Sequence, residues 1–304
     1  MNIDSLFSTL DTQVLGESFR IIIQSPITFK TTDIKEKNKL LKRSFEQEKK
    51  LLLNEPRGHR GINGCLIFPA NTDSFELLFL NHDYSIPFKY EGVAAGLTAL
   101  LETGNLSPNP DGKYSVITPY GRVYLTTKLK DGQVTSVKTN ISTAEKRKNK
   151  DNSLTVCIDE QRYYKMATLP KSIESIDVNN LESITKWGED IVERNKTSNP
   201  ELTGVILVDK VQDNHFKSIT FERDGYIRRT PGIDSTEAII ESFENDINDE
   251  EEIINETIFS SRLSMNRNSK NHEKAYYELR PFITGTHDFI LDSDDPLPTG
   301  FLLQ

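Results

Sequence analysis

The sequence predicts an α/β (α+β) protein of two lobes, each a set of strands wrapped around one central helix, with a cleft between the lobes. Three observations favour this architecture. The 304 residues are enough for two domains of about 150 residues each. Short apolar runs typical of strands occur in both halves of the chain. A polar loop that leads into an apolar helix occurs twice, at residues 84–104 and 224–243.

The first half of the chain begins with strand and helix signals. Residues 17–24 predict a strand behind a turn at Gly16. Residues 32–54 carry leucines at helical spacing among many Lys and Glu, which predicts one exposed amphipathic helix. A polar, glycine-dense segment at 54–65 then precedes a buried strand at 75–81.

The stretch at 84–104 places reactive side chains at a helix start. Its loop delivers Lys89, Tyr90 and Glu91 to an apolar helix that stops at Gly104. Free backbone N–H groups at such a start, together with the helix dipole, favour an anion. An ordinary loop-to-helix junction explains the same pattern.

The rest of the chain predicts mostly strands. Residues 114–118, 122–127 and 133–137 predict strands, the last two joined by a hairpin turn at Lys130-Asp-Gly132. The polar, basic segment 140–153 marks the expected domain boundary. The later elements, in chain order, are a strand at 154–158, a helix at 181–195, strands at 205–208 and 219–221, and an acidic loop at 245–252.

The second loop-to-helix stretch repeats the design of the first. Pro231 lies in a polar loop that leads to Asp234 and Ser235, and either residue is a good N-cap for the apolar helix that runs to Phe243.

Composition and charge narrow the class of protein. The net charge of −9 argues against an extended nucleic-acid footprint and favours a small-molecule or protein partner. No apolar run approaches the roughly 20 residues that span a bilayer, and the N-terminus shows no secretory signal. Two cysteines argue against a disulfide framework. We therefore expect a cytoplasmic protein that contacts neither nucleic acid nor membrane. The sequence leaves open whether it forms a homodimer.

Five segments of the chain carry motifs that together cover nearly its whole length. In chain order they are Asp11–Arg20, Asn54–Gly64, Asn81–Gly104, Asn255–Leu263 and Phe289–Leu303. They are similar, in the same order, to five motifs: an opening D-x-H-x-x-G-E-x-x-R (with Gln13 where His is usual), an E-P-R-G-H signature, an N-x-G-Y segment with its E-x-G helix end, an E-S-I-x-G-S block and a D-P-x-x-x-G-F ending. These are motifs of the proline racemase family, which the chain therefore resembles.

The resemblance implies a fold and a chemistry. It implies the two-lobed diaminopimelate-epimerase-like fold, with residues 1–145 plus 285–304 in the N-terminal lobe and 146–284 in the C-terminal lobe. Active members use no cofactor. Two cysteines at helix starts face the substrate's α-carbon from opposite sides, where one removes a proton and the other returns one. Members that lack the second cysteine tend to be dehydratases.

This sequence departs from the family pattern where that chemistry lies. Lys89 stands at the position of the first cysteine and Glu91 at that of the histidine. Gly232 stands at the position of the second cysteine, and Arg228 replaces the aspartate expected near the substrate's nitrogen.

For several other residues a structural role explains the pattern at least as well as a functional one. We expect Cys65 and Cys157 to be core residues, and Arg57 to be structural. Tyr163 and Tyr164 fall near the aromatic pair that shields the pocket in the family, with core packing as the equal alternative.

The candidate site follows from these positions. Lys89, as base or amine nucleophile, and Glu91, as its acid–base partner, are the candidate catalytic residues. The alternative is that these two residues neutralise one another, or pair with Asp234 and Arg228, and fill the former pocket. We expect no metal and no cofactor. The candidate substrate-binding residues are Tyr90, Arg228, Gly232, Ile233, Asp234 and Ser235.

Two functions remain open from the sequence. One is an atypical, cofactor-independent isomerase or lyase that abstracts a proton from a proline-like or amino-acid-derived small molecule, and is not a standard proline racemase. Its one-sided chemistry favours elimination or proton shift over racemisation. The other is a catalytically inactive proline racemase homologue with a binding or regulatory role. Closed ion pairs around Lys89 would count against the enzyme.

Overall fold

The computed structural model divides the chain into two compact units, described here one at a time. Unit 1 comprises Met1–Tyr84, Glu91–Val137 and Arg280–Gln304, and unit 2 comprises Ser85–Tyr90 and Lys138–Leu279. The described residues are 3–82, 88–139, 144–148, 154–159, 162–248, 251–266, 276–292 and 294–303. The predicted loop at 84–87 and most of the predicted boundary at 140–153 lie outside them.

Unit 1 is built on eight strands in the order β16-β1-β2-β3-β4-β5-β6-β7. The β2–β3 and β4–β5 pairs are parallel, while β16 returns from the end of the chain to pair antiparallel with β1. The strands are β1 (Ile3–Val14), β2 (Glu17–Gln24), β3 (Ile62–Asn71), β4 (Ser74–Leu80), β5 (Lys113–Thr118), β6 (Gly121–Lys130), β7 (Gln133–Thr139) and β16 (Phe282–Asp292).

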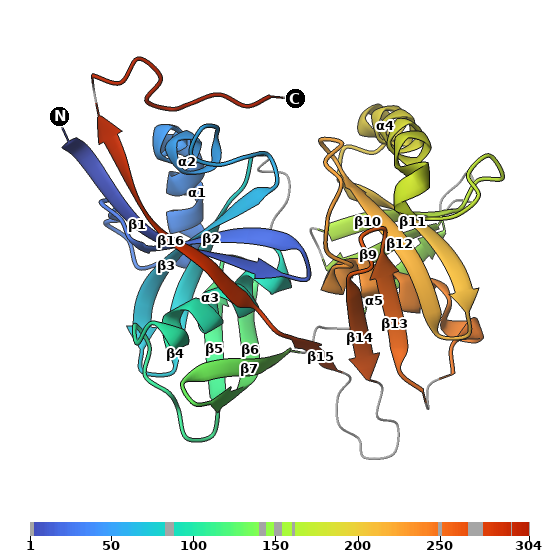
Figure 1. Cartoon of the computed structure of the whole chain (residues 1–304), viewed down its shortest axis with the longest axis horizontal. Helices are drawn as coiled ribbons and strands as arrows, with labels where there is room; N and C mark the ends of the chain where they lie inside the picture. Colours follow the sequence, from blue (N-terminus) through green and yellow to red (C-terminus); the bar gives the residue numbers. More distant parts are fainter. Residues whose placement is uncertain are drawn as a thin grey trace. The chain divides into compact units, whose positions relative to one another are not determined.

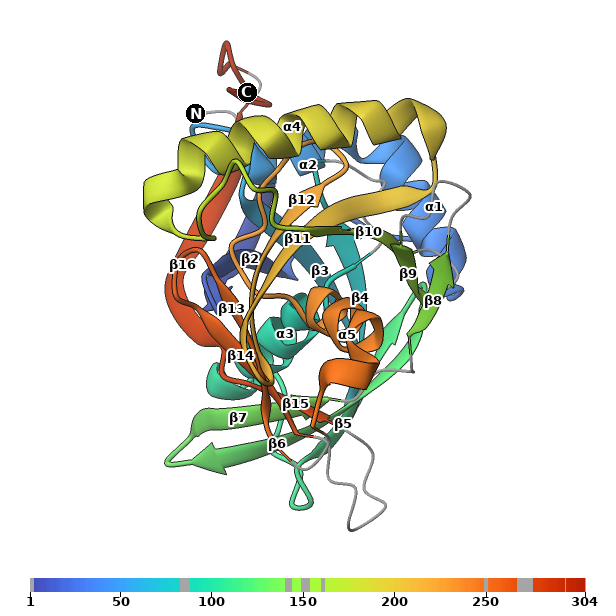
Figure 2. The same cartoon turned by 90° about the vertical axis from the view of Figure 1, so that its right-hand side faces the viewer.

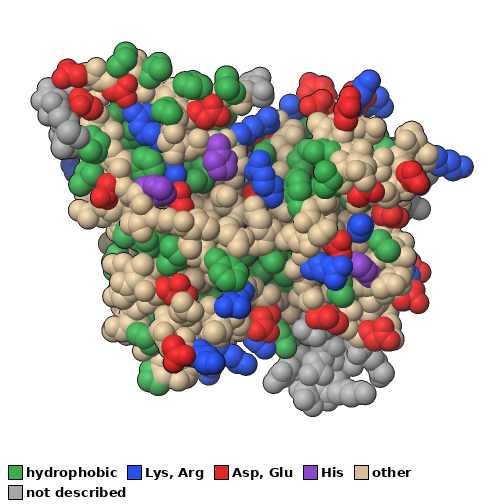
Figure 3. All heavy atoms as spheres, in the orientation of Figure 1, with side chains coloured by type: hydrophobic (Ala, Val, Ile, Leu, Met, Phe, Trp, Pro, Cys, Tyr) green, Lys and Arg blue, Asp and Glu red, His purple; other side chains and the backbone are tan. Residues whose placement is uncertain are grey.

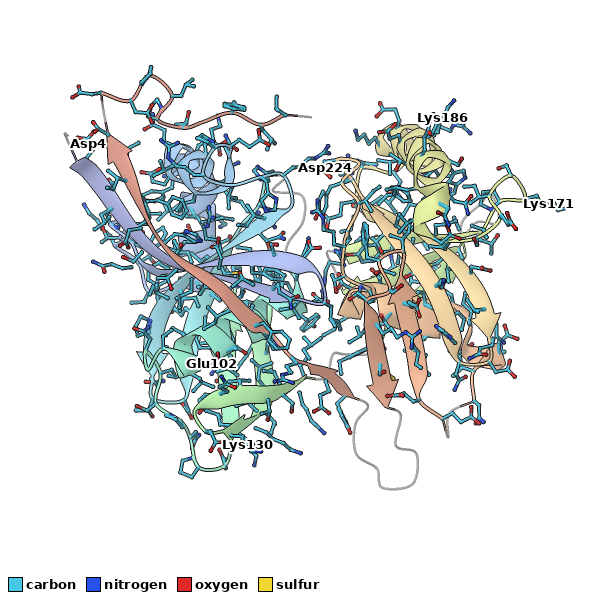
Figure 4. All side chains as sticks on the ribbon, in the orientation of Figure 1. Asp4, Glu102, Lys130, Lys171, Lys186 and Asp224 are labelled. Carbon is cyan, nitrogen blue, oxygen red and sulfur yellow. The ribbon has the colours of Figure 1, made fainter. Side chains whose placement is uncertain are left out.

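Helix α3 (Tyr90–Glu102) is the central helix of unit 1, enclosed by its strands (Figure 1). Every residue of α3 up to Leu101 is buried, which requires small residues where the sheet comes close. A Cβ added to Gly92 would lie 2.7 Å from Phe79 and 2.9 Å from Phe19. At the other end of the helix, Glu102, labelled in Figure 4, accepts a 2.8 Å hydrogen bond from the Val134 N–H. The predicted central helix is confirmed.

The exposed helix predicted at 32–54 is wrong in two respects. The segment forms two helices, α1 (Ile34–Ser44) and α2 (Glu46–Leu53), which meet at Phe45, where ψ of 36° leaves the helical range. Leu51, Leu52 and Leu53 are completely buried in a core cluster with strand residues. The reason is that the outer face of the sheet is apolar and needs a cover, which the three consecutive leucines of α2 provide.

The segment after α2 holds the C-terminal residues in place. Asn54 Nδ2 donates to the Thr299 carbonyl at 3.1 Å, and the Glu55 N–H donates to the Phe301 carbonyl at 2.9 Å. Arg57 Nη2 lies 2.5 Å from the Asp295 carboxylate. The structural role expected for Arg57 is therefore confirmed.

Unit 2 repeats this design with the order β15-β14-β13-β12-β11-β10-β9-β8. It again contains two parallel pairs, β10–β11 and β12–β13. The strands are β8 (Glu145–Lys148), β9 (Leu154–Asp159), β10 (Arg162–Thr168), β11 (Leu202–Gln212), β12 (His215–Glu222), β13 (Ile253–Thr257), β14 (Arg262–Asn266) and β15 (Tyr276–Leu279).

The helices of unit 2 lie inside and outside its sheet. Helix α5 (Ile233–Ser242) is the central helix, buried from its first residue through Ile240. Helix α4 (Leu181–Ser198) lies across the outside of β11 and β12 (Figure 2), where Trp187 makes an edge contact with Phe221 at 5.9 Å between ring centres. Two short 3-10 turns complete the unit, at Val178–Asn180 and Glu244–Asp246. The predicted α/β class, with strands around one helix in each half, is confirmed.

The surface charges, the apolarity of the described helices and the two cysteines do not point to a specialised site. Acidic and basic side chains are interspersed on the face shown in Figure 3. Among the described helices, none combines the length and apolarity needed to cross a membrane. Cys65 and Cys157 are both buried and unbridged, in β3 and β9, as expected for core residues.

Candidate functional site

The candidate site in unit 2 is organised around the carboxylate of Glu222, the last residue of β12. Lys89 Nζ lies 2.9 Å from Glu222 Oε1, and Arg228 Nε lies 3.2 Å from the same oxygen. The side chains of Lys89, Glu222 and Arg228 are 1%, 5% and 0% exposed. Two cations therefore share one carboxylate out of contact with water.

A second carboxylate, that of Asp234 in α5, continues the network. Its Oδ2 accepts a 2.6 Å hydrogen bond from the Tyr164 hydroxyl. The same oxygen lies 3.5 Å from Arg228 Nη1 and 3.7 Å from Arg162 Nη1. Arg228 thus joins the Glu222 and Asp234 carboxylates into one buried ion network.

Burial and charge set the protonation states in this network. Burial by itself would raise the pKa of Asp234, but Arg228, Arg162 and the Tyr164 hydrogen bond outweigh it and hold that pKa below its usual value. Burial raises the pKa of Tyr164 far above its usual value. Asp234 is therefore an ionised acceptor, and Tyr164 is a protonated donor to it.

Arg162, the first residue of β10, also secures the segment that carries Lys89. Its guanidinium lies 4.5 Å from the ring centre of Phe88 and 5.0 Å from that of Tyr90. Arg162 Nη2 donates to the Tyr90 hydroxyl at 3.5 Å. Lys89 itself lies over the ring of Tyr226 at 5.7 Å. Cation–π contacts of this kind gain strength when they are desolvated.

The turn that positions Arg228 is fixed by backbone hydrogen bonds. Asp224, labelled in Figure 4, accepts a 2.9 Å hydrogen bond from the Tyr226 N–H. The Glu222 N–H donates to the Tyr226 carbonyl at 2.8 Å, and the Arg228 N–H donates to the Thr220 carbonyl at 2.9 Å. Arg228 is consequently held against β12. Its buried charge is compensated by two carboxylates, those of Glu222 and Asp234, so Arg228 takes part in pairing of the kind given above as the alternative to a reactive site.

The N-cap predicted for α5 is also wrong. The N-cap is Gly232, with φ of 73°, and Asp234 and Ser235 are the second and third residues of the helix. Their side chains are engaged elsewhere: Asp234 by the arginines and Tyr164, and Ser235 by the Thr220 hydroxyl at 2.8 Å. With its left-handed φ, Gly232 begins the helix two or three residues earlier than the side-chain pattern indicates.

Gly232 and Arg228 are sterically linked. A Cβ at Gly232 would lie 2.8 Å from Arg228 Nη1 and 3.2 Å from Ser235 Oγ. A side chain at 232 therefore competes with the buried guanidinium for the same space. Glycine at 232 therefore leaves the space that the buried Arg228 side chain occupies.

We expect Gly232→Ala to lower the free energy of unfolding by about 2–4 kcal/mol, because backbone strain and a clash in a packed interior add. Gly225→Ala is the matched control, since Gly225 has φ of 85° but nothing within 4 Å of the added Cβ. The control should cost only about 1 kcal/mol, the strain alone. Urea unfolding measures both, and equal costs would show that Arg228 does not fill this space.

The candidate site residues predicted from the sequence lie in both units. Lys89, Arg228, Asp234 and Ser235 come together in unit 2. Glu91 is the first-turn acid of α3, completely buried, and belongs to unit 1. The remaining candidates are buried beside the network: Tyr90, Gly232 and Ile233.

Two members of the network, Glu222 and Arg162, were missed as site residues. Each lies beside other charged residues in the sequence, Glu222 before Arg223 and Asp224 and Arg162 after Asp159 and Glu160, so no local signal marks either one as buried. Tyr164, noted above as a possible pocket residue, donates to Asp234.

Metal chemistry finds no support among the described residues, where no group of three or more His, Cys, Asp or Glu side chains could hold an ion. The network itself consists of cations in contact with carboxylates. What it can do chemically is bind an ion, relay charge, or hold its own elements together.

Comparison with known proteins places these observations in context. The family model described as proline racemase matches residues 9–159. A trans-3-hydroxy-L-proline dehydratase of Bacillus thuringiensis subsp. konkukian is 27% identical, with all of both chains covered. An enzyme of the same name from Bacillus cereus is also 27% identical over the full length of both chains.

A solved structure agrees at the level of the fold. The hydroxyproline epimerase of Agrobacterium vitis, with bound trans-4-hydroxy-L-proline, superposes with a TM-score of 0.82 at 17% identity. It covers 100% of this chain and 96% of the epimerase.

Proposed function

Because this chain belongs to the proline racemase family, we propose that it is a catalytically inactive proline racemase homologue with a binding or regulatory role. The observation that carries this proposal is the buried ion network of unit 2. Lys89 and Arg228 share the Glu222 carboxylate, and Arg228 and Arg162 share that of Asp234. Each candidate reactive group in unit 2 is thereby engaged by a partner of opposite charge.

Proton abstraction by Lys89 would need its neutral form, and the ion network does not favour that form. A lysine acts as a base only when it is neutral, and a carboxylate at 2.9 Å stabilises its charged form. Racemisation also needs a second acid–base group on the opposite face of the α-carbon, and Gly232, at the position of the second cysteine, has no side chain. In this proposal, the position of the family's first catalytic cysteine holds a residue of a buried, structural ion network in this chain.

The proposal predicts no α-proton chemistry with family-type substrates. We expect the purified chain to exchange no α-proton of L-proline, D-proline or trans-4-hydroxy-L-proline in deuterated water, followed by proton NMR. A functional proline racemase prepared in parallel controls for the assay. Turnover of either proline enantiomer would overturn the proposal.

A second candidate is a lyase that removes water from a β-hydroxy amino acid such as trans-3-hydroxy-L-proline. Two relatives that align over their full length carry the name of that dehydratase. Dehydration needs one base on one face, and Lys89 beside Glu222 is the candidate pair. The substrate's hydroxyl leaves as water after the α-proton is removed.

Consumption of trans-3-hydroxy-L-proline separates the two candidates. The lyase predicts that substrate disappears with the wild-type chain and persists with Lys89→Ala, provided that the variant is folded by circular dichroism. The inactive homologue predicts that substrate persists with both.

A further inference from the structure

The carboxylate of Asp234 is held as a bound anion would be held. One hydrogen bond and two ion-pair contacts converge on its Oδ2: the Tyr164 hydroxyl donates at 2.6 Å, and Arg228 Nη1 and Arg162 Nη1 lie 3.5 and 3.7 Å away. Its Oδ1 is buried and has no hydrogen-bond partner among the described residues. All four side chains are at most 2% exposed. Paired arginines and a tyrosine hydroxyl are the usual protein partners of a carboxylate ligand.

The position of Asp234 in α5 adds to this attraction. It is the second residue of a ten-residue helix, within the first turn, where the helix dipole stabilises negative charge. The arginines and Tyr164 keep the Asp234 pKa low in spite of burial. The surroundings of Asp234 thus stabilise its ionised carboxylate over the neutral acid.

Asp234 is a carboxylate that two arginines of the network share. Among the described residues, Arg162 and Arg228 both contact its Oδ2, while Lys89 and Arg228 contact Glu222. Without Asp234, Arg162 and Arg228 lose the anion that they share in a buried site. Such a site strongly favours uptake of a replacement anion over empty space.

We propose that the Asp234 carboxylate is a built-in occupant of an anion site formed by Arg162, Arg228 and Tyr164, and that this site binds a free small monocarboxylate once the Asp234 side chain is removed. The inference rests on the proposed function, in which unit 2 keeps a ligand position filled by its own side chains. It also gives an expectation for the wild-type chain: because the Asp234 carboxylate fills this position, a free carboxylate does not bind there.

Rescue of Asp234→Ala by formate tests this assignment. Formate has the size and charge of the deleted carboxylate group. We expect the melting temperature of Asp234→Ala to rise by about 5–10 °C at formate a hundredfold above its dissociation constant, with saturation. Wild type should shift by less than about 1 °C, because its site is filled.

Two controls separate this effect from general salt effects. Asp213→Ala removes an aspartate that is 89% exposed and should behave as wild type does. Asp234→Asn fills the space with a neutral amide, so formate should stabilise it no more than wild type. A folded Asp234→Ala that formate does not stabilise would overturn the proposal.

The test remains decisive if Asp234→Ala does not fold unaided. Refolding from urea with formate, and without it at matched sodium chloride, then replaces the melting curve. Recovery of folded protein only with formate supports the site, and equal failure in both overturns it. The α-proton exchange assay on wild type separately decides the proposed function, so the two can fail independently.

Discussion

Replacing Glu222 with glutamine should lower the free energy of unfolding by about 5 kcal/mol, the largest effect we expect from one substitution in unit 2. Removing one partner of a buried ion pair typically costs about 3–5 kcal/mol, and Glu222 serves two cations, Lys89 and Arg228. Both are at most 1% exposed, so water cannot replace the lost carboxylate. Urea unfolding followed by circular dichroism measures the change.

A surface pair gives the matched control. Glu36 and Lys39 form an ion pair at 2.5 Å, but their side chains are 50% and 72% exposed. Glu36→Gln should cost less than about 1 kcal/mol. A similarly small cost for Glu222→Gln would mean that Lys89 is solvated, which would favour its use as a base.

A double substitution tests whether Lys89 and Glu222 act as a unit. Combining Glu222→Gln with Lys89→Met removes one of the two cations that contact the Glu222 carboxylate. The double variant should therefore be more stable than Glu222→Gln alone, whereas additive costs would show that the two residues are independent.

Replacing Arg20 with alanine should have a comparable effect in unit 1, about 3–5 kcal/mol. Arg20 is 4% exposed, and it donates to both oxygens of Asp11 at 2.9 and 2.8 Å. Its Nη1 also donates to the carbonyls of Leu52 and Arg57. One guanidinium thus joins β1, β2, α2 and the turn that follows α2.

The geometry of this site requires arginine rather than any cation. Lysine keeps the charge but lacks the planar fork that reaches Asp11 and two carbonyls together. Arg20→Lys should therefore recover less than half of the loss. Arg122→Ala, at an exposed position bonded to Ser115, is the control and should change stability by less than about 0.5 kcal/mol. Full recovery by lysine would show that charge alone matters.

The sequence alone predicted the elements whose signals are local. The two central helices were predicted because each combines an apolar face with a loop before it, and the β6–β7 hairpin because Asp131 and Gly132 favour a tight turn with positive φ. Their observed φ values are 52° and 79°. The ordered motifs also identified the family, because they record backbone requirements that persist when individual side chains change.

Local signals failed where the neighbours decide the outcome. The helix predicted at 32–54 was expected to be exposed, but three leucines of α2 cover the sheet. Asp234 was expected to cap α5, since aspartate near a helix start commonly does so. Two arginines and a tyrosine attract its carboxylate more strongly than the helix N–H groups do.

The candidate site shows the same division. The sequence placed Lys89, Gly232 and Arg228 at the positions that matter, and it left open whether they are reactive or paired. Only the tertiary structure placed Glu222 beside Lys89 and Arg228, and Arg162 beside Asp234. The physical reason is that partners in a buried ion network are chosen by three-dimensional proximity and the cost of desolvation, and neither leaves a periodic trace along the chain.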